Sequence, residues 1–116
     1  MLEHRRSRRK RVQSSIQVFD ALSDKPIGYV GNLSSEGMLL IGNRALRADA
    51  LFQFTFLITN TVTRKTHRAE IGVHEQWSER ANVEGQYWAG FRIIDISPED
   101  QKVLDSWLNN PGGQFA

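Results

Sequence analysis

Cysteine is absent from this chain of 116 residues, so disulfide bonds and thiolate chemistry are excluded. A chain without cysteine suits a reducing compartment, and we expect a cytoplasmic location. Apolar runs are short as well. None approaches the ~20 residues that a membrane-spanning helix requires, which predicts no membrane span. No hydrophobic stretch follows the basic N-terminus, so its pattern is not that of a secretory signal.

Recognisable catalytic and metal-binding motifs are also missing. The histidines His4, His67 and His74 are scattered, and none has a second ligand at a spacing such as H-x-x-x-H. Neither a G-x-S-x-G sequence nor a phosphate-binding P-loop is present. We therefore predict a protein that is not an enzyme, holds no metal and needs no cofactor.

Charge is distributed unevenly along the chain. Residues 1–11 hold six basic side chains and one acidic one, whereas the remainder holds nine basic and twelve acidic ones. The chain is thus a mildly acidic body with a basic arm, which predicts an anionic partner: a nucleotide, a nucleic acid or a membrane surface. Five of the six basic residues are arginines, which favour planar, directed contacts. The alternative is a solvated tail.

Period-2 alternation predicts a mainly β protein. The clearest case is 51–58, where Phe52, Phe54, Phe56 and Ile58 alternate with other residues. Similar patterns predict strands over 15–20, 28–33, 38–41, 66–77 and 87–96, with a polar loop over 78–86. Six short strands favour a small antiparallel β-barrel, since closure removes exposed edges.

One α-helix is predicted near the C-terminus. Ser97 suits an N-cap, Pro98 the first helical position, and Glu99 and Asp100 the first turn, where the helix dipole favours acids. Behind them an apolar stripe is formed by Val103, Leu104, Trp107 and Leu108. The expected organisation is a flexible basic arm over 1–14, the barrel with its helix over 15–110, and a tail over 111–116.

Two short motifs occur in a suggestive order. Arg5 and Arg9 form an R-x-x-x-R motif, and Asn32, Ser34 and Gly37 form an N-x-S-x-x-G motif some twenty residues later. With a β-rich body and a terminal helix, this order resembles the PilZ family of bacterial cyclic di-GMP receptors. The resemblance continues downstream with Trp77 at a strand end, then the Gly-Phe pair at 90–91 and Ile-Asp-Ile-Ser at 94–97.

The resemblance implies roles for the arginines. Arg5 and Arg9 would bind guanine edges and phosphates, and an arginine fork does match the paired O6 and N7 acceptors of guanine. Arg6 and Arg8 would add phosphate contacts. Arg11 is a rival for one of the motif positions, because a hydrophobic residue follows it.

For the second motif, each ligand role stands beside a structural one. Asn32 would contact a guanine or close an Asx turn. Ser34 would contact a phosphate or base, or bond within its turn. Gly37 would allow positive φ or a close ligand approach. Trp77 would stack on a base or pack at the barrel rim.

The resemblance thus implies a cyclic di-GMP receptor whose arm closes over the ligand and changes the surface that an effector protein reads. Motility, biofilm or exopolysaccharide control would be the output. One or two bound ligands are both compatible with the motifs. The alternatives are a β-barrel that binds nucleic acid through the basic arm, which the acidic body disfavours, and an adaptor that works by protein contacts alone.

Overall fold

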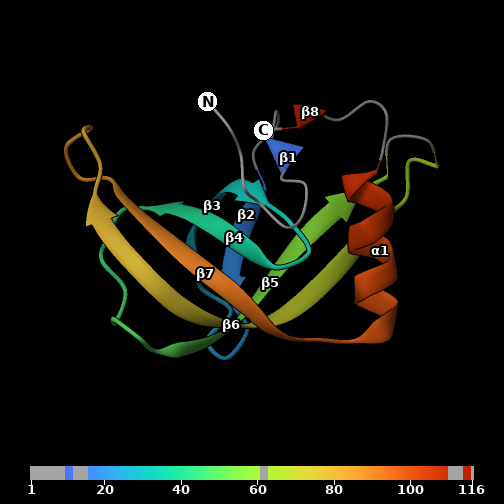
Figure 1. Cartoon of the computed structure of the whole chain (residues 1–116), viewed down its shortest axis with the longest axis horizontal. Coiled ribbons are helices and arrows are strands. Elements are labelled where there is room, and N and C mark those ends of the chain that lie inside the picture. Colours follow the sequence, from blue (N-terminus) through green and yellow to red (C-terminus); the bar gives the residue numbers. More distant parts are fainter. Residues whose placement is uncertain (1–9, 12–15, 61–62, 110–113, 116) are drawn as a thin grey trace.

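A computed structural model of the chain describes residues 10–11, 16–60, 63–109 and 114–115. Six antiparallel strands form a ring in the order β2-β5-β6-β7-β4-β3, and β3 pairs back onto β2 to close it (Figure 1). The expected six-stranded barrel with one C-terminal helix is therefore confirmed. Its strands are β2 (Gln17–Asp20), β3 (Pro26–Leu33), β4 (Gly37–Gly42), β5 (Leu51–Thr59), β6 (Thr66–Arg80) and β7 (Tyr87–Ile96).

The core fills the barrel with the inward-facing residues of each strand. On β5, Phe54, Phe56 and Ile58 are buried, as their alternation predicted. Phe54 packs edge-on against Phe91 of β7, with ring centroids 5.0 Å apart. Aromatic pairs favour this geometry because the edge of one ring meets the electron-rich face of the other.

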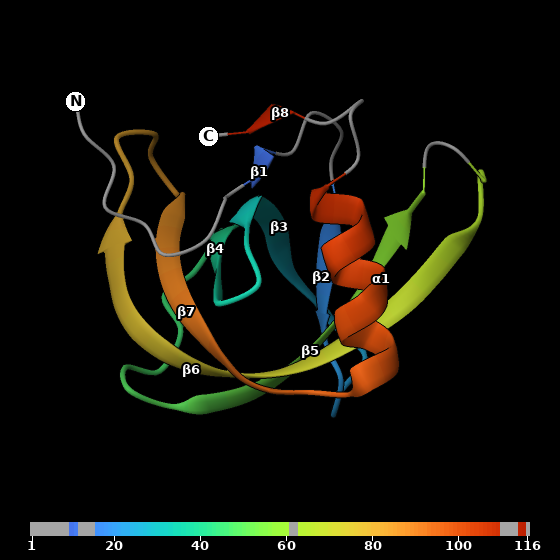
Figure 2. The ribbon, with the colours of Figure 1, turned by 45° about the vertical axis from the view of Figure 1, so that its right-hand side comes forward.

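Helix α1 (Pro98–Leu108) lies against β5 and β6 and covers one side of the barrel (Figure 2). The Ser97 hydroxyl accepts a hydrogen bond from the Asp100 N–H at 3.1 Å, which confirms the predicted N-cap. Leu104, Trp107 and Leu108 are buried and join the core of the barrel. Among the described residues, no helix has the length and apolar character needed to cross a membrane.

Three features differ from the sequence-based expectation. Strand β6 continues to Arg80, so the polar loop begins three residues later than predicted. It continues because Arg80 pairs with Tyr87 of β7, although the end of the strand is exposed. Two further short strands, β1 (Lys10–Arg11) and β8 (Gln114–Phe115), lie in segments expected to be arm and tail; β1 pairs with β3 and with β8.

Candidate functional site

A large pocket of the described structure lies on the outer face of the barrel, over four neighbouring strands. Its volume is about 810 Å³. Strands β3, β4, β7 and β6 lie side by side beneath it (Figure 1). Its lining residues include Asn32, Ser35, Glu36, Gly37, Leu39, Trp77, Glu79, Trp88, Gly90 and Arg92. The pocket thus combines polar turn residues, two indoles and charged side chains of both signs.

Asn32 reaches this face because β3 contains a bulge. The register of β3 against β4 shifts between Val30 and Asn32. Leu33, the next residue, is fully buried, so Asn32 faces the opposite way, toward the pocket that it lines. A bulge re-aims side chains in this manner and is common beside binding sites. The expected guanine-contact residue therefore occupies the outer face.

The turn between β3 and β4 is held together by the Ser34 side chain. Its hydroxyl accepts hydrogen bonds from the N–H groups of Glu36 at 3.2 Å and Gly37 at 3.1 Å. It also lies 3.4 Å from the Gly37 carbonyl oxygen, to which it donates. Ser34 is fully buried, so the structure gives it the turn-bonding role of the two that we considered.

Gly37 lines the pocket and pairs with Arg92 of β7. The glycines with positive φ in the described chain are Gly28 and Gly85, so Gly37 has no need of that freedom. Gly37 is buried, so at this position the backbone itself forms part of the pocket wall. The Ile93 N–H donates to the Glu36 carbonyl at 2.8 Å and fixes the turn onto β7.

Trp77 owes its position to a second bulge, between Glu75 and Trp77 in β6. Glu75 points into the barrel and is 3% exposed, whereas Trp77 faces outward and is 45% exposed. The indole lies against Gly90, its partner across the strand pair. Trp88, 39% exposed, lines the same pocket. Trp77 is therefore a rim residue that leaves much of its surface open to a ligand.

The buried Glu75 carboxylate braces the strand that carries Trp77. One oxygen accepts from the Asp49 N–H at 2.8 Å and the other from the Ser78 hydroxyl at 2.5 Å. A buried carboxylate requires such donors, because burial removes its hydration. These bonds connect the loop before β5 to the part of β6 that carries Trp77.

The arginines of the first motif, Arg5, Arg6, Arg8 and Arg9, lie outside the described residues. The chain that follows them is placed: the backbone of β1 pairs with β3, with Lys10 opposite Leu33 and Arg11 opposite Asn32. Strand β1 therefore lies beside Asn32, which lines the pocket.

Sequence reasoning missed several residues of the pocket, among them Gly90 and Arg92. Gly90 was noted only as part of a family pattern, and its role under Trp77 follows from cross-strand pairing. Arg92 sits in an apolar strand and is not part of any motif. Only the alternation of Phe91, which is buried, with the exposed Arg92 signals that the arginine faces outward.

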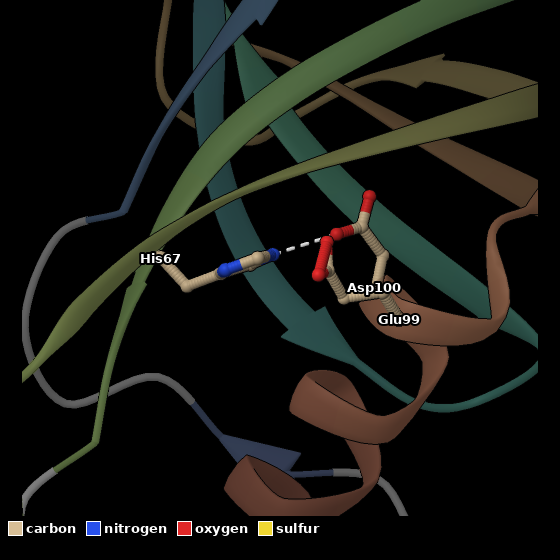
Figure 3. Close-up of side chains that lie close together, drawn as sticks. All are labelled: His67, Glu99 and Asp100. Carbon is tan, nitrogen blue, oxygen red and sulfur yellow. Dashed lines mark hydrogen bonds and ion pairs between the residues drawn. The ribbon is translucent and has the colours of Figure 1, made fainter.

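A second cluster of polar side chains lies at the start of β6, where His67 is close to Glu99 and Asp100 of α1 (Figure 3). One ligand atom from each residue lies within 4.8 Å of the others. The Asp100 oxygens already accept from His67 Nε2 at 2.6 Å and from the Glu70 N–H at 3.1 Å. A metal ion would have to displace these bonds, so we assign the cluster the role of fastening α1 to β6.

These bonds lower the pKa of the Asp100 carboxyl. Burial opposes its ionisation, but hydrogen bonds from His67, the Glu70 N–H and Ser97, with the charge of His67, hold the pKa of the Asp100 carboxyl below 3.8, its ordinary value. No local pattern predicts this contact, because its partners are 33 residues apart in the sequence.

Comparisons with known proteins assign the fold. No protein-family model matches the chain, and no curated protein does either. Among solved structures, it is similar to the Bacillus subtilis inhibitor of motility (MotI/DgrA), with a TM-score of 0.71 and 11% identity over 89% of this chain and 48% of that one. It is also similar to the PilZ domain of YcgR from Escherichia coli, solved with c-di-GMP, with a TM-score of 0.55 and 14% identity over 90% and 88%.

The fold defines a class of small antiparallel β-barrels with a C-terminal helix. Within that class, the chain has a PilZ-like fold. It spans about half the length of the Bacillus subtilis structure. At these levels of identity the likeness concerns the fold alone.

Proposed function

We propose that the protein is a non-enzymatic receptor for cyclic di-GMP, and that the pocket on the outer face of the barrel is its binding site. The observation that carries the proposal is that Asn32 and Gly37, from the β3–β4 hairpin, line the same pocket as Trp77, which is distant from both in the sequence. A volume of about 810 Å³ is in the range of small-molecule sites.

The guanine bases would be recognised by stacking and by hydrogen bonds. The open face of the Trp77 indole offers a flat apolar surface, and stacking of a base on an aromatic side chain contributes about 1–3 kcal/mol. Asn32 lines the same pocket from β3, and an asparagine amide carries both a donor and an acceptor. Ser34 would act indirectly, by holding the turn that carries Gly37.

The phosphates would be bound by the arginine-rich segment. Two carboxylates, Glu36 and Glu79, line the pocket, so a ligand with two phosphates requires additional cations. Arg5, Arg6, Arg8 and Arg9 precede β1 in the sequence, and β1 lies beside Asn32. Charge-assisted hydrogen bonds of roughly 1.5–3 kcal/mol each offset the roughly 1–2 kcal/mol per residue that ordering the segment costs.

Ligand binding would then change the surface of the protein. A segment that orders over a bound ligand alters the local charge and shape, and a partner can distinguish the two states. We propose an effector protein as that partner, in the control of motility, biofilm or exopolysaccharide. The two similar structures support this output, one being an inhibitor of motility and the other a domain with c-di-GMP bound.

The nucleic-acid alternative is less well supported. Single-strand binding requires exposed aromatic platforms along a positive groove. Phe54 and Phe56 are buried, and the pocket that holds the exposed Trp77 and Trp88 is also lined by two acids, Glu36 and Glu79. The receptor therefore remains our proposal.

Isothermal titration calorimetry with cyclic di-GMP tests it on the full chain. We expect saturable binding by the wild type and a loss of at least about tenfold in the Arg5→Ala/Arg9→Ala double variant. The Arg8→Ala/Arg11→Ala double variant removes the same charge, and comparison of the two shows which arginines contribute more to binding. Cyclic di-AMP tests recognition of the base. No heat of binding from the wild type at micromolar ligand would refute the receptor.

A parallel titration with single-stranded RNA separates the alternatives. RNA binding that falls steeply with salt, without any response to cyclic di-GMP, would favour a nucleic-acid-binding module. Absence of both would leave an adaptor that works by protein contacts alone.

A further inference from the structure

The charges around the pocket are unbalanced for an anionic ligand. Among the described lining residues the ionisable side chains are Glu36, Glu79 and Arg92. Two of them are acids, and Arg92 is the one cation. A ligand phosphate placed on this face avoids repulsion only where it can approach that guanidinium.

Arg92 is well placed for such a contact. It lies on β7 directly opposite Gly37, whose backbone borders the pocket. The adjacent hydrogen bond from Ile93 to Glu36 fixes the turn and β7 relative to each other. Backbone pairing therefore holds the turn and Arg92 side by side, which favours a defined position for an anion.

The Arg92 side chain is also uncommitted. It is exposed, and within the described chain it makes no hydrogen bond or ion pair. Its cross-strand neighbour His74 is engaged with Asp49 at 2.5 Å, so that acid already has a partner. A free guanidinium loses no existing contact when it binds a phosphate, and its fork can bind two oxygens at once.

We infer that Arg92 binds a phosphate of the cyclic dinucleotide from the barrel side. This inference rests on the proposed function. It assigns part of the phosphate recognition to a cation fixed on the barrel, in the same pocket as Trp77.

Titration of cyclic di-GMP at several salt concentrations tests the inference. Arg92→Gln should weaken binding about 10- to 100-fold and reduce its dependence on salt. Arg92→Lys keeps the charge without the fork and should lose less. Arg68→Gln is the matched control, because Arg68 is an exposed arginine on β6 outside this pocket; its affinity should equal that of the wild type.

A variant that is expected to tighten binding distinguishes loss of a ligand contact from damage to the fold. Glu36→Gln removes a carboxylate from the same rim and should tighten binding by about two- to fivefold. A wild type that binds, with Arg92→Gln and Arg68→Gln equal to it, overturns the inference alone. A wild type that does not bind overturns the proposed function and this inference together.

Discussion

The indole of Trp77 lies on the backbone of Gly90, its partner across the β6–β7 pair. A methyl group at residue 90 would overlap the indole nitrogen and stand 2.5 Å from its Cε2 atom. Real side chains do not tolerate such contacts, so glycine is the residue that lets the ring lie flat there. The exposed face of Trp77 is thus set by a residue that need not touch the ligand.

Substitution of Gly90 should therefore move Trp77. We expect Gly90→Ala to weaken cyclic di-GMP binding by about 5- to 100-fold, approaching Trp77→Ala, because stacking on the displaced ring is lost. Calorimetry gives the affinity, and far-UV circular dichroism checks that the barrel persists. Trp77→Phe should retain part of the affinity. Equal binding by Gly90→Ala and the wild type would contradict this role.

The Ser34 hydroxyl should matter for stability before it matters for binding. Ser34→Ala leaves the N–H groups of Glu36 and Gly37 without their acceptor, and each buried unsatisfied group costs about 1–3 kcal/mol. Urea denaturation should show a loss in this range. Ser35→Ala, in the same turn and half-buried, is the control and should stay within about 0.5 kcal/mol. Equal losses would argue against the turn-bonding role.

Local patterns predicted the barrel and its helix well. The alternation around Phe54 gave β5, and the cap at Ser97 with the acids behind it gave the start of α1. Both signals are contained within one element, where side-chain periodicity and hydrogen bonds involve near neighbours. The extra strands β1 and β8 have two residues each, too few for any period.

The candidate site was predictable only in part. Asn32 and Trp77 were identified by resemblance to a family pattern. Each reaches the pocket through a β-bulge, and no local sequence pattern predicts either bulge. Gly90 and Arg92 acquire their roles from strands that pair across the sheet. The contact of His67 with Asp100 likewise joins a strand to a helix. Registers and long-range pairs depend on tertiary packing, which a local pattern does not encode.

Acid should loosen the attachment of α1. The pKa of the Asp100 carboxyl is lower in the folded protein than 3.8, its ordinary value, so its contribution to stability is complete above that pH and is lost as the pH falls through the folded-state value. We expect the free energy of unfolding to drop below about pH 4. Asp100→Asn should be less stable at neutral pH and less sensitive to acid.

Urea denaturation between about pH 3 and pH 7 measures this difference. Asp105→Asn is the control, because Asp105 lies on the same helix, is exposed and bonds only within it. It should keep the acid sensitivity of the wild type. An Asp100→Asn curve parallel to that of the wild type would rule out the contribution of this carboxyl.

The buried carboxylate of Glu75 should contribute to stability. Both of its oxygens accept, from the Asp49 N–H and the Ser78 hydroxyl. In Glu75→Gln, the amide oxygen can still accept from the Asp49 N–H, but the NH₂ group must donate to a rotated Ser78 hydroxyl, and both bonds lose the strength that a carboxylate acceptor gives them. We expect a loss of about 1–3 kcal/mol in urea denaturation, and weaker cyclic di-GMP binding because Trp77 follows two residues later. Glu79→Gln makes the same chemical change on the exposed end of β6 and should stay within about 0.5 kcal/mol; if both variants behave alike, the network does not brace the strand.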